Sequence, residues 1–567
     1  MNRFYFAFSF LIIVRSAAGQ IFPSTKYPHD LFRNPLGIPM SLAANFGELR
    51  TNHYHMGLDI RTEHRENLPV YAAADGYVYR VKIEPFGFGQ AIYIRHAGGY
   101  LTLYAHLNAF YPELAAWVKK KQYELNRWDV SLDLPDGLFR VKKGDLIALS
   151  GNRGGSQGPH LHFEIRTFPE DINLNPLLFG LPVKDETPPV IRSLSVYDRN
   201  RSFYEQKPSF LPVKGGSGQY TISLQEIICN TPNPGFGILG FDTQSGSGNP
   251  NGLYEGIIYD NGKPVSGFQM NHISYSETIG INAHIDYPTH AQGGPYYQLL
   301  FKMPGYEHSI YNETSPGGII HLEDRLQHNI RIELKDAAGN SASLEFRARY
   351  EEHSSILNEI SGKMFYPGMV DGIETPDAAF YLGETSLYDS LHLSEQESPG
   401  LVNDLVSNLH QFGNSNIPLA DTLTVRIKQK KLLEWKQKVL LQWTEGSEFE
   451  VKKPLWMGDW ATGAFRNFGT FSLVLDTVPP TIRIPGIAEN ANLRRSQRLS
   501  VLVRDNYHKI KNFRATLDGK WLLFSNDKAR AYIYNFDEHC SPGKHELKIY
   551  AEDEAGNTSS HTLHFSR

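Results

Sequence analysis

Two short phrases occur twice in this chain of 567 residues and divide it into modules. DETPPVIRSLSVYD (185–198) is similar to DTVPPTIRIPG (476–486), and LKDAAGNSASLEFRARY (334–350) is similar to AEDEAGNTSSHTLHFSR (551–567). The shared Asp-x-Ala-Gly-Asn run is typical of a tight turn between two strands, because Gly and Asn accept positive φ angles. A start phrase and an end phrase that both recur indicate repeated modules. The second copy has about 90 residues, the usual size of an antiparallel β-sandwich.

These phrases give an expected layout for the chain. Residues 187–350 form a β-module with an insertion, and residues 479–567 form a β-sandwich. Residues 351–476 are strand-like in places and are expected to form another β-rich module. Residues 34–182 precede them as a separate domain. The predicted fold is therefore mostly β, in several domains.

Residues 34–182 are rich in glycine and in short alternating runs. VYAAADGYVYRV (70–81) and QAIYIRHAGGYLTLYAHL (90–107) predict two hairpins, the first around an Asp-Gly turn. The stretch at about 108–140 interrupts this pattern. It contains AFYPELAAWVKKKQYELN, whose apolar residues have helical spacing and whose Pro112 suits a first helical turn. We expect an antiparallel β domain with a helical insertion.

The N-terminus and the overall charge restrict where the protein works. Arg3 is followed by an apolar run and then by small residues up to Gly19, the pattern of a secretory signal peptide over residues 1–19. We expect an exported protein, in the periplasm, in the cell envelope or secreted, with no transmembrane segment. The net charge of −5 and the absence of basic runs argue against nucleic acid as a partner. The two cysteines are expected to be buried thiols, since two are too few for a disulfide framework.

GPHLHFEIR (158–166) places two histidines on one face of a predicted strand. Side chains alternate between the two faces of a strand, so His160, His162 and Glu164 share one face. The apolar residues between them face the opposite way, into a core. Such a polar face is either a solvated surface or part of a metal site. Glu164 either supports a ligand histidine or forms an ion pair.

HYHMGLDIR supplies two further ligand-type side chains, His55 and Asp59. In a straight strand they would lie roughly 13 Å apart, too far to share an ion, but Gly57 permits a bend. A catalytic zinc takes about three protein ligands and leaves one position open, so His162 could complete the set. His160 lies about 6–7 Å along the strand from His162. That is too far for comfortable binding of the same ion, but close enough to contact a water or a substrate carbonyl.

Six stretches occur in the order found in one family of enzymes. They are His55-Met-Gly-Leu-Asp59, Val70-Tyr-Ala-Ala-Ala-Asp-Gly76, Gly87-Phe-Gly-Gln-Ala-Ile-Tyr-Ile94, Tyr104-Ala-His-Leu107, Val141-Lys-Lys-Gly-Asp145 and Gly158-Pro-His-Leu-His-Phe-Glu164. This order resembles the lysostaphin-type, or LytM-type, peptidoglycan metalloendopeptidases of the M23 family. The resemblance implies a compact antiparallel β domain with a groove across it and Zn2+ held by His55, Asp59 and His162. It also implies that His106 and His160 flank the reacting water and the scissile carbonyl as catalytic residues.

Two departures from the family pattern concern loops. Gly151-Asn-Arg-Gly-Gly-Ser156 replaces a more usual Gly-x-Thr-Gly-x-Ser run, and the insertion at 108–140 is long. We hypothesise that the insertion lies near the groove and shapes substrate entry. The later modules resemble bacterial Ig-like domains of envelope proteins through their Pro-Pro start phrases and Asp-x-Ala-Gly-Asn end phrases. Such modules are usually spacers or adhesive elements, and a shared fold gives them no chemistry of their own.

The resemblance implies an exported zinc endopeptidase that hydrolyses peptide crosslinks of peptidoglycan during cell-wall remodelling. Two other functions stay open at this point. One is a catalytically silent regulator that binds and activates another cell-wall hydrolase. The other is an envelope adhesin or scaffold in which the β-modules do the main work. Peptidoglycan peptide is the expected substrate, and the C-terminal β-modules are the expected contact for a protein partner in the envelope.

Overall fold

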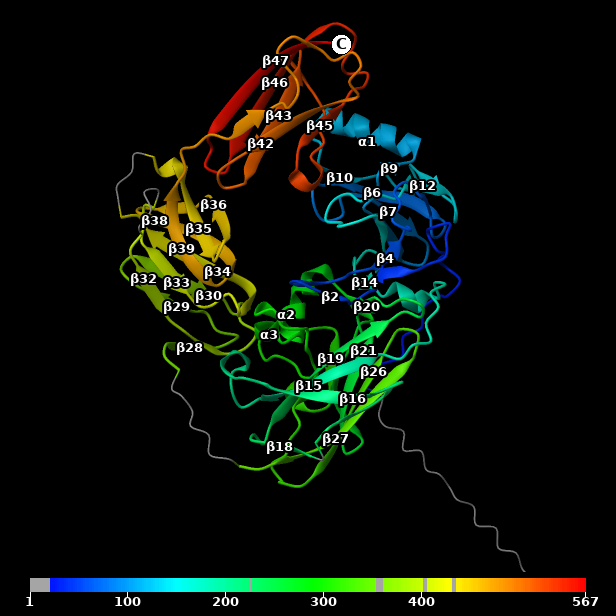
Figure 1. Cartoon of the computed structure of the whole chain (residues 1–567), viewed down its shortest axis with the longest axis vertical. Coiled ribbons are helices and arrows are strands. Elements are labelled where there is room, and N and C mark those ends of the chain that lie inside the picture. The colour runs from blue at the N-terminus through cyan, green and yellow to red at the C-terminus, as the bar shows by residue number, and fades with distance from the viewer. Residues whose placement is uncertain (1–20, 225, 353–359, 401–404, 431–434) are drawn as a thin grey trace, which may run out of the picture.

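The fold was examined in a computed structural model of the whole chain. It describes residues 21–567 except 225, 353–359, 401–404 and 431–434. Figure 1 shows a closed ring of β-rich parts, in which the C-terminal part (red) lies against helix α1 (Pro112–Leu125) of the first domain. The prediction of a mostly β fold with a helical insertion is confirmed. The predicted signal peptide, residues 1–19, lies outside the described residues. Within the described part of the chain, the helices are too short or too polar to cross a bilayer.

The first domain is built on one large sheet. Its main strands follow the order β1-β4-β13-β8-β7-β6-β10 and pair antiparallel. They are β1 (Leu42–Ala44), β4 (Leu58–Arg61), β13 (His160–Thr167), β8 (Tyr100–Ala105), β7 (Gln90–His96), β6 (Gly76–Ile83) and β10 (Val130–Asp133). A smaller sheet contains β5 (Pro69–Tyr71), β12 (Leu146–Leu149) and β9 (Ala109–Phe110). A separate hairpin of β2 (Leu49–Arg50) and β3 (His53–Tyr54) precedes β4 in the chain.

One of the two predicted hairpins is correct and the other is wrong. Strands β7 and β8 pair with each other around Gly98-Gly99, as the 90–107 pattern predicts. Strands β5 and β6 of the 70–81 stretch do not pair, because β5 belongs to the small sheet and β6 to the large one. The segment between them, Ala72–Ala74, is buried. Its small side chains let the chain cross from one sheet to the other within the core.

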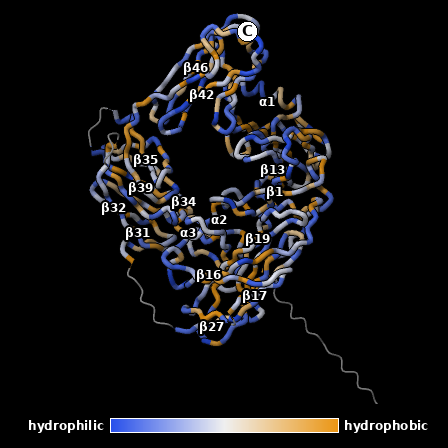
Figure 2. Tube along the Cα trace, in the orientation of Figure 1, coloured by the Kyte–Doolittle hydropathy of each residue, from blue (hydrophilic) through white to orange (hydrophobic). Residues whose placement is uncertain are grey.

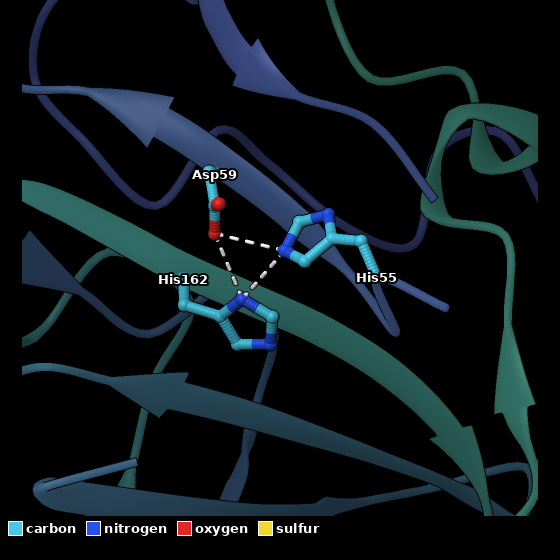
Figure 3. A group of neighbouring side chains, drawn as sticks. All are labelled: His55, Asp59 and His162. Atoms are coloured by element: carbon cyan, nitrogen blue, oxygen red, sulfur yellow. Dashed lines mark hydrogen bonds and ion pairs between the residues drawn. The ribbon is translucent and has the colours of Figure 1, made fainter. Parts of the chain in front are cut away.

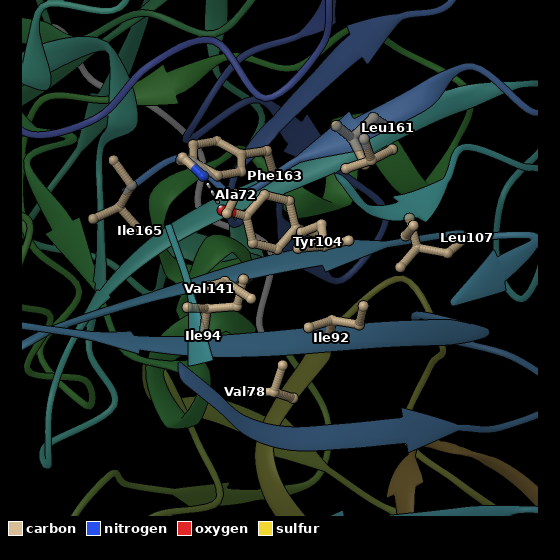
Figure 4. Close-up of a cluster of buried hydrophobic side chains, with 14 of the residues drawn as sticks. Ala72, Val78, Ile92, Ile94, Tyr104, Leu107, Val141, Leu161, Phe163 and Ile165 are labelled. Carbon is tan, nitrogen blue, oxygen red and sulfur yellow. Dashed lines mark hydrogen bonds between the residues drawn. The ribbon is translucent and has the colours of Figure 1, made fainter. Parts of the chain in front are cut away.

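The core of the first domain lies between these sheets. Leu161, Phe163 and Ile165 of β13 have no exposed surface and point into it, as the alternation in GPHLHFEIR predicts. Figure 4 shows them packed with apolar side chains from the neighbouring strands, among them Ile92 and Tyr104. Burial of a large apolar side chain contributes about 1.5–3 kcal/mol. The opposite face of β13 is therefore held in a fixed position for the polar residues.

Helix α1 forms within the predicted insertion. Pro112 occupies its first turn, and Asn126 ends it in the left-handed conformation. Leu114 and Val118 are buried in the core of the first domain, whereas Leu125 is 52 % exposed. The helix thus covers the first domain with one side and leaves its C-terminal end available for other contacts.

The second part of the chain has its own large sheet, and one of its short strands joins the sheet of the first domain. Strand β14 (Asn173–Leu174) pairs with both β13 and β23 (His272–Ile273), so the two parts share hydrogen bonds. The main strands are β15 (Val190–Asp198), β16 (Ser209–Gly216), β17 (Gln219–Ile222), β19 (Pro234–Thr243), β20 (Pro250–Asn251), β21 (Glu255–Asp260), β22 (Lys263–Gln269), β25 (Tyr311–Glu313), β26 (His328–Lys335) and β27 (Ser341–Tyr350). A 3-10 helix, η3 (Tyr275–Gly280), and two short helices, α2 (Ile281–His284) and α3 (Tyr287–Ala291), follow β23.

The last two parts each stack two sheets. One contains β29 (Asp371–Glu374), β30 (Ala378–Leu382), β34 (Pro418–Lys428), β38 (Trp460–Asn467) and β37 (Leu455–Met457), opposite β32 (Glu395–Ser398), β33 (Leu409–Phe412), β39 (Gly469–Leu475), β35 (Val439–Glu445) and β36 (Glu448–Lys452). The other contains β40 (Thr481–Arg483), β42 (Arg498–Arg504) and β45 (Tyr532–Asn535), opposite β41 (Ala491–Asn492), β47 (Thr558–Ser566), β46 (Lys544–Asp553), β43 (Ile510–Leu517) and β44 (Lys520–Trp521). Figure 2 shows hydrophobic stretches in every part of the ring, and each part has its own buried core. Cys229 and Cys540 are both free and buried, as expected.

Direct contacts close the ring between the C-terminal part and the first domain. The ring of Tyr123 at the end of α1 stacks on His539, with centroids 3.7 Å apart. Lys119 forms ion pairs of 2.8 Å with Asp537 and Glu538. A 3-10 turn, η6 (Asp527–Ala529), contacts the first domain as well. The insertion that carries α1 is therefore the docking surface for the C-terminal part.

Candidate metal centre

Three predicted ligand residues meet at one point of the large sheet. Asp59 of β4 lies directly opposite His162 of β13 in the sheet register, and His55 follows β3. Asp59 Oδ1 lies 2.9 Å from both His55 Nε2 and His162 Nδ1, and those two nitrogens are 3.0 Å apart (Figure 3). All three side chains are buried. The structure thus brings together one carboxylate oxygen and two imidazole nitrogens, the donor types that zinc prefers.

Gly57 is needed between His55 and Asp59 for a reason different from the predicted one. The chain does bend between β3 and β4, but a Cβ atom at Gly57 would lie 2.4 Å from the carbonyl oxygen of Phe163 and 2.7 Å from Glu164 Cγ. Glycine is therefore required because β13 approaches the backbone so closely. This close approach places the His55 ring over the end of β13.

Hydrogen bonds on the far side of each ring direct one nitrogen toward the cluster. The backbone carbonyl of Asn45 accepts a hydrogen bond of 2.7 Å from His55 Nδ1. The carboxylate of Glu164 accepts a hydrogen bond of 2.8 Å from His162 Nε2. In these tautomers His55 Nε2 and His162 Nδ1 both present lone pairs to each other and to Asp59. Lone pairs at such distances repel one another unless a proton or a metal ion lies between them, and the three atoms are of the types that bind a metal ion, so the donor set fits one.

Glu164 is the most heavily bonded group behind the cluster. It has no exposed surface and accepts hydrogen bonds from His162, from Arg166 Nε at 2.6 Å, from Asn173 Nδ2 at 2.8 Å and from the Tyr275 hydroxyl at 2.7 Å. Burial alone would raise the pKa of Glu164, but the Arg166 charge and the hydrogen bonds lower it to about 2. Burial likewise opposes protonation of His162, but its bonds to Asp59 and Glu164 raise its pKa to about 9 in the absence of a metal. Of the two predicted roles, Glu164 supports a candidate ligand and is also ion-paired.

Two groups at the site were not predicted from the sequence. Tyr275 comes from η3 in the second part of the chain; the β14–β23 pairing and a hydrogen bond from Tyr54 N to Thr278 Oγ1 place η3 beside the first domain. Arg50 of β2 donates a hydrogen bond of 3.1 Å to Asp59 Oδ2, the carboxylate oxygen that faces away from the histidines. A lone Tyr and a lone Arg carry no spacing signal, so no local pattern could have identified them.

His106 and His160 lie beside the three clustered residues. Their ring centroids are 4.7 Å apart, and His160 Nε2 is 3.3 Å from Asp59 Oδ1. The Nδ1 atoms donate to backbone carbonyls, from His106 to Arg153 and from His160 to Gly158, each at 2.8 Å. The Nε2 atom of His106 therefore remains available as an acceptor, whereas that of His160 faces Asp59 Oδ1. Burial, reinforced by the neighbouring histidines, lowers the pKa of His106 to about 3 and keeps the ring neutral at pH 7.

A cleft of 870 Å³ opens over this cluster. All five predicted site residues line it, together with the loops around Phe88 and Gly155–Pro159 and with Tyr275 and Thr278 from the second part. Among the described lining residues, none comes from the 108–140 insertion. The insertion therefore does not line the cleft itself; α1 packs on the core of the first domain and contacts the C-terminal part, and its influence on substrate entry stays a prediction.

The sequence matches two family models. Residues 53–123 match the model of Peptidase family M23, a range that includes His55, Asp59 and His106, and residues 364–476 match that of a Zu5-like domain. The DD-carboxypeptidase/endopeptidase Mpg of Neisseria meningitidis is 36 % identical over 139 residues, which are 24 % of this chain and 26 % of that protein. The peptidoglycan DD-endopeptidase ShyA of Vibrio cholerae is 34 % identical over 97 residues, 17 % of each chain. The alignments thus span about a quarter or less of these relatives.

Among solved structures, the catalytic domain of lysostaphin from Staphylococcus simulans aligns with 22 % identity and a TM-score of 0.18. That alignment covers 24 % of this chain and 88 % of the lysostaphin domain. Residues 53–123 of this protein are thus similar to peptidase family M23.

Proposed function

We propose that this protein is an exported zinc metalloendopeptidase that hydrolyses peptide crosslinks of peptidoglycan in the periplasm or cell envelope. The observation that carries the proposal is the donor set of His55, Asp59 and His162, whose lone pairs converge in a buried position at the floor of an open cleft. The relatives, a peptidoglycan DD-endopeptidase among them, favour peptidoglycan as the substrate.

In this proposal, His55 Nε2, Asp59 Oδ1 and His162 Nδ1 hold the zinc ion. A bound zinc ion supplies Lewis acidity, which polarises a peptide carbonyl and lowers the pKa of water. His106 is neutral, and its Nε2 accepts a hydrogen bond and then a proton from the attacking water. His160, fixed through its Nδ1 by the Gly158 carbonyl, holds its ring over the same space and orients the reacting groups.

The test is digestion of isolated peptidoglycan by the purified protein, with the products identified by mass spectrometry. We expect crosslinked muropeptides to be converted to uncrosslinked ones. A metal chelator and the His162→Ala variant should each reduce the conversion to the level of a buffer blank. His321→Ala is the matched control, because His321 is exposed and lies in the second part of the chain.

The metal content of the same samples separates the remaining functions. Wild-type protein that contains zinc and leaves every crosslink intact would contradict the endopeptidase proposal and favour the regulator of another hydrolase. Protein without zinc and without activity would contradict the proposed ligand set as well. Which peptide bond is cut follows from the masses of the released muropeptides.

A further inference from the structure

Each of the two repeated modules contains a group of three aspartates at its base. The first aspartate group is Asp185, Asp242 and Asp336, and the second aspartate group is Asp476, Asp505 and Asp553. In each group one carboxylate oxygen per residue lies within 4.8 Å of those of the other two. The first member of each group opens the start phrase of its module, and the last member begins the Asp-x-Ala-Gly-Asn turn. The recurring phrases therefore supply aspartates to an acidic cluster that is present in both modules.

The two groups are built in the same way. Asn340 donates from its backbone N to Asp336 Oδ1 at 2.8 Å and from Nδ2 to Asp336 Oδ2 at 2.7 Å. Asn557 makes the same two bonds to Asp553, at 2.7 and 2.9 Å. Each asparagine Nδ2 also donates to the backbone carbonyl of the first aspartate, Asp185 at 3.3 Å or Asp476 at 3.1 Å. Two parts of the chain with different strand orders thus share one local arrangement.

Both groups contain buried carboxylate oxygens that nothing on the protein satisfies. Asp242 is 4 % exposed and its Oδ1 has no hydrogen-bond partner. Asp476 is 1 % exposed and its Oδ2 has none, and Asp505 Oδ1 also lacks one. Among the described residues, no Lys, Arg or His forms an ion pair with any of the six aspartates. A buried carboxylate costs several kcal/mol unless it is paired, so each group lacks a cation.

Burial and repulsion between the carboxylates of the first group both raise the pKa of Asp242. Burial and the neighbouring charges of Asp185 and Asp336 raise the pKa of Asp242 to about 8. Burial also raises the pKa of Asp336 and of Asp476. An ion with two positive charges at the centre of each group would remove this repulsion and accept the unpartnered oxygens as ligands.

We propose that each aspartate group binds one Ca2+ ion. The donors in both groups are oxygens, which hard cations prefer, whereas a zinc site would be expected to include imidazole or thiolate. Ca2+ accepts six to eight oxygens in flexible geometry, so three carboxylates with backbone carbonyls and waters can complete its shell. These sites are separate from the candidate metal centre and do not depend on its chemistry.

Both ions would lie at junctions between parts of the ring. Asp185 is in the segment that leaves the first domain, and Gln244, two residues after Asp242, accepts a hydrogen bond of 3.0 Å from Leu42 N of β1. In the second group, Lys438 of the third part donates to the carbonyl of Gly556, in the turn that begins at Asp553, at 2.7 Å. Ca2+ would therefore fix the orientation of adjacent parts, because an ion that binds the folded junction stabilises it.

Calorimetric titration of the cation-free full chain with CaCl2 tests the proposal. We expect two Ca2+ ions per chain. At a hundredfold excess over the dissociation constant, the thermal unfolding temperature should rise by roughly 5–10 °C. MgCl2 should give a much smaller shift, because Mg2+ needs a near-octahedral shell and loses its waters reluctantly. Absence of Ca2+ binding would overturn the proposal, and equal binding of Mg2+ would overturn the assignment to Ca2+.

Single substitutions locate the ions. Asp242→Asn should remove one Ca2+ and Asp505→Asn the other, with the double variant binding neither. Each variant should be at least as stable as wild type without cation, since the substitution removes a carboxyl group that repels its neighbours when ionised. Asp459→Asn is the matched control, because Asp459 is half exposed and lies outside both groups. Ca2+ binding that is unchanged in both cluster variants would overturn the assignment to these residues, whereas binding at the candidate metal centre would be common to all variants.

Discussion

At the scale of single residues, Glu164 connects the candidate metal centre to the second part of the chain. Its carboxylate fixes the His162 ring on one side and accepts the Tyr275 hydroxyl on the other. Arg166 also lies over the Tyr275 ring, 4.7 Å from its centroid. The orientation of the His162 ring therefore depends on Tyr275, which lies 111 positions after Glu164 in the sequence.

Tyr275→Phe should weaken zinc binding by roughly tenfold, the lower end of what outer-shell partners contribute. The change removes one hydrogen bond to Glu164 and leaves the aromatic contacts in place. Competition with a chromogenic zinc chelator measures the affinity. Tyr296→Phe, a partly buried tyrosine of the same part of the chain, should leave it unchanged. Equal affinities for the Tyr275 variant and wild type would show that Tyr275 does not position the ligand.

His96 should make the stability of the first domain sensitive to acid. It is 5 % exposed, and burial lowers its pKa to about 4 in the folded protein, below the value of about 6.5 in an unfolded chain. Between those values the unfolded state binds the extra proton, so stability falls by up to about 1.4 kcal/mol per pH unit as the pH decreases from 6.5 to 4.

Denaturant unfolding at several pH values checks this. In His96→Gln the slope of the unfolding free energy against pH should be shallower by up to one proton over that window. The absolute stability of the variant is not the readout, since its hydrogen bonds to Asp75 and Thr102 also change. A slope identical to that of wild type would exclude His96 as the titrating group.

The residues that the sequence could identify lie in short stretches that resemble those of one enzyme family. His55, Asp59 and His162 come from short stretches, and the antiparallel pairing of β4 with β13 brings these together. Arg50 and Tyr275 have no such pattern, because their positions depend on contacts between elements far apart in sequence. The ambiguity over Glu164 could be resolved only by its burial, which depends on the second part of the chain.

At the scale of elements, the turn η6 holds a loop that borders the cleft. Asp527 Oδ1 accepts a hydrogen bond of 2.8 Å from Gly154 N, and Lys528 Nζ donates to the carbonyl of Ser156 at 2.6 Å. Lys528 has a φ of 57°, an uncommon conformation for a residue other than glycine. The contact thus fixes the segment that leads to the candidate catalytic His160.

Lys528→Ala should loosen this loop without unfolding either part. Because two hydrogen bonds from Lys528 Nζ are lost, amide hydrogen exchange over residues 151–158 should become about tenfold faster, which corresponds to a loss of about 1.4 kcal/mol. Lys520→Ala, an exposed lysine of the same part, is the control. Unchanged exchange in the loop would indicate that the first domain alone holds it.

The sequence predicts helix α1 itself but not the part of the chain that it contacts. The Pro112 signal and the apolar spacing identify the helix correctly. Its partner could not be identified, because the residues that contact the C-terminal part, Lys119 and Tyr123, are polar or amphipathic and resemble any solvated helix surface. The hairpin error at 70–81 has a similar origin, since a turn signal does not say whether the two strands stay in one sheet.

At the scale of the whole molecule, the four parts form a ring that closes on the candidate peptidase domain (Figure 1). Strand β23 of the second part joins the sheet of the first domain, whereas the first and last parts meet mainly through side chains and one backbone hydrogen bond, from Lys528 N to the Pro85 carbonyl. Exposed ion pairs contribute at most about 1 kcal/mol each. The contact between α1 and the C-terminal part thus rests on a few modest side-chain interactions.

A triple variant with Lys119→Ala, Tyr123→Ala and Lys528→Ala should open the ring. The ion pairs, the ring stack and the loop contacts are lost together, so the last part swings away from the first domain. Small-angle X-ray scattering should then report a larger radius of gyration. Lys120→Ala serves as the control, because Lys120 is 76 % exposed on the same helix. A radius of gyration equal to that of wild type would mean that other junctions hold the ring closed.

The stacking of Tyr123 on His539 joins residues 416 positions apart in one chain. Because the intervening parts tether the two surfaces, each meets the other at an effective concentration that two free proteins rarely reach. An interface of a few modest contacts can then stay formed nearly all the time. The same C-terminal part, cut from the chain and added back in solution, would bind so weakly that the contact would escape detection.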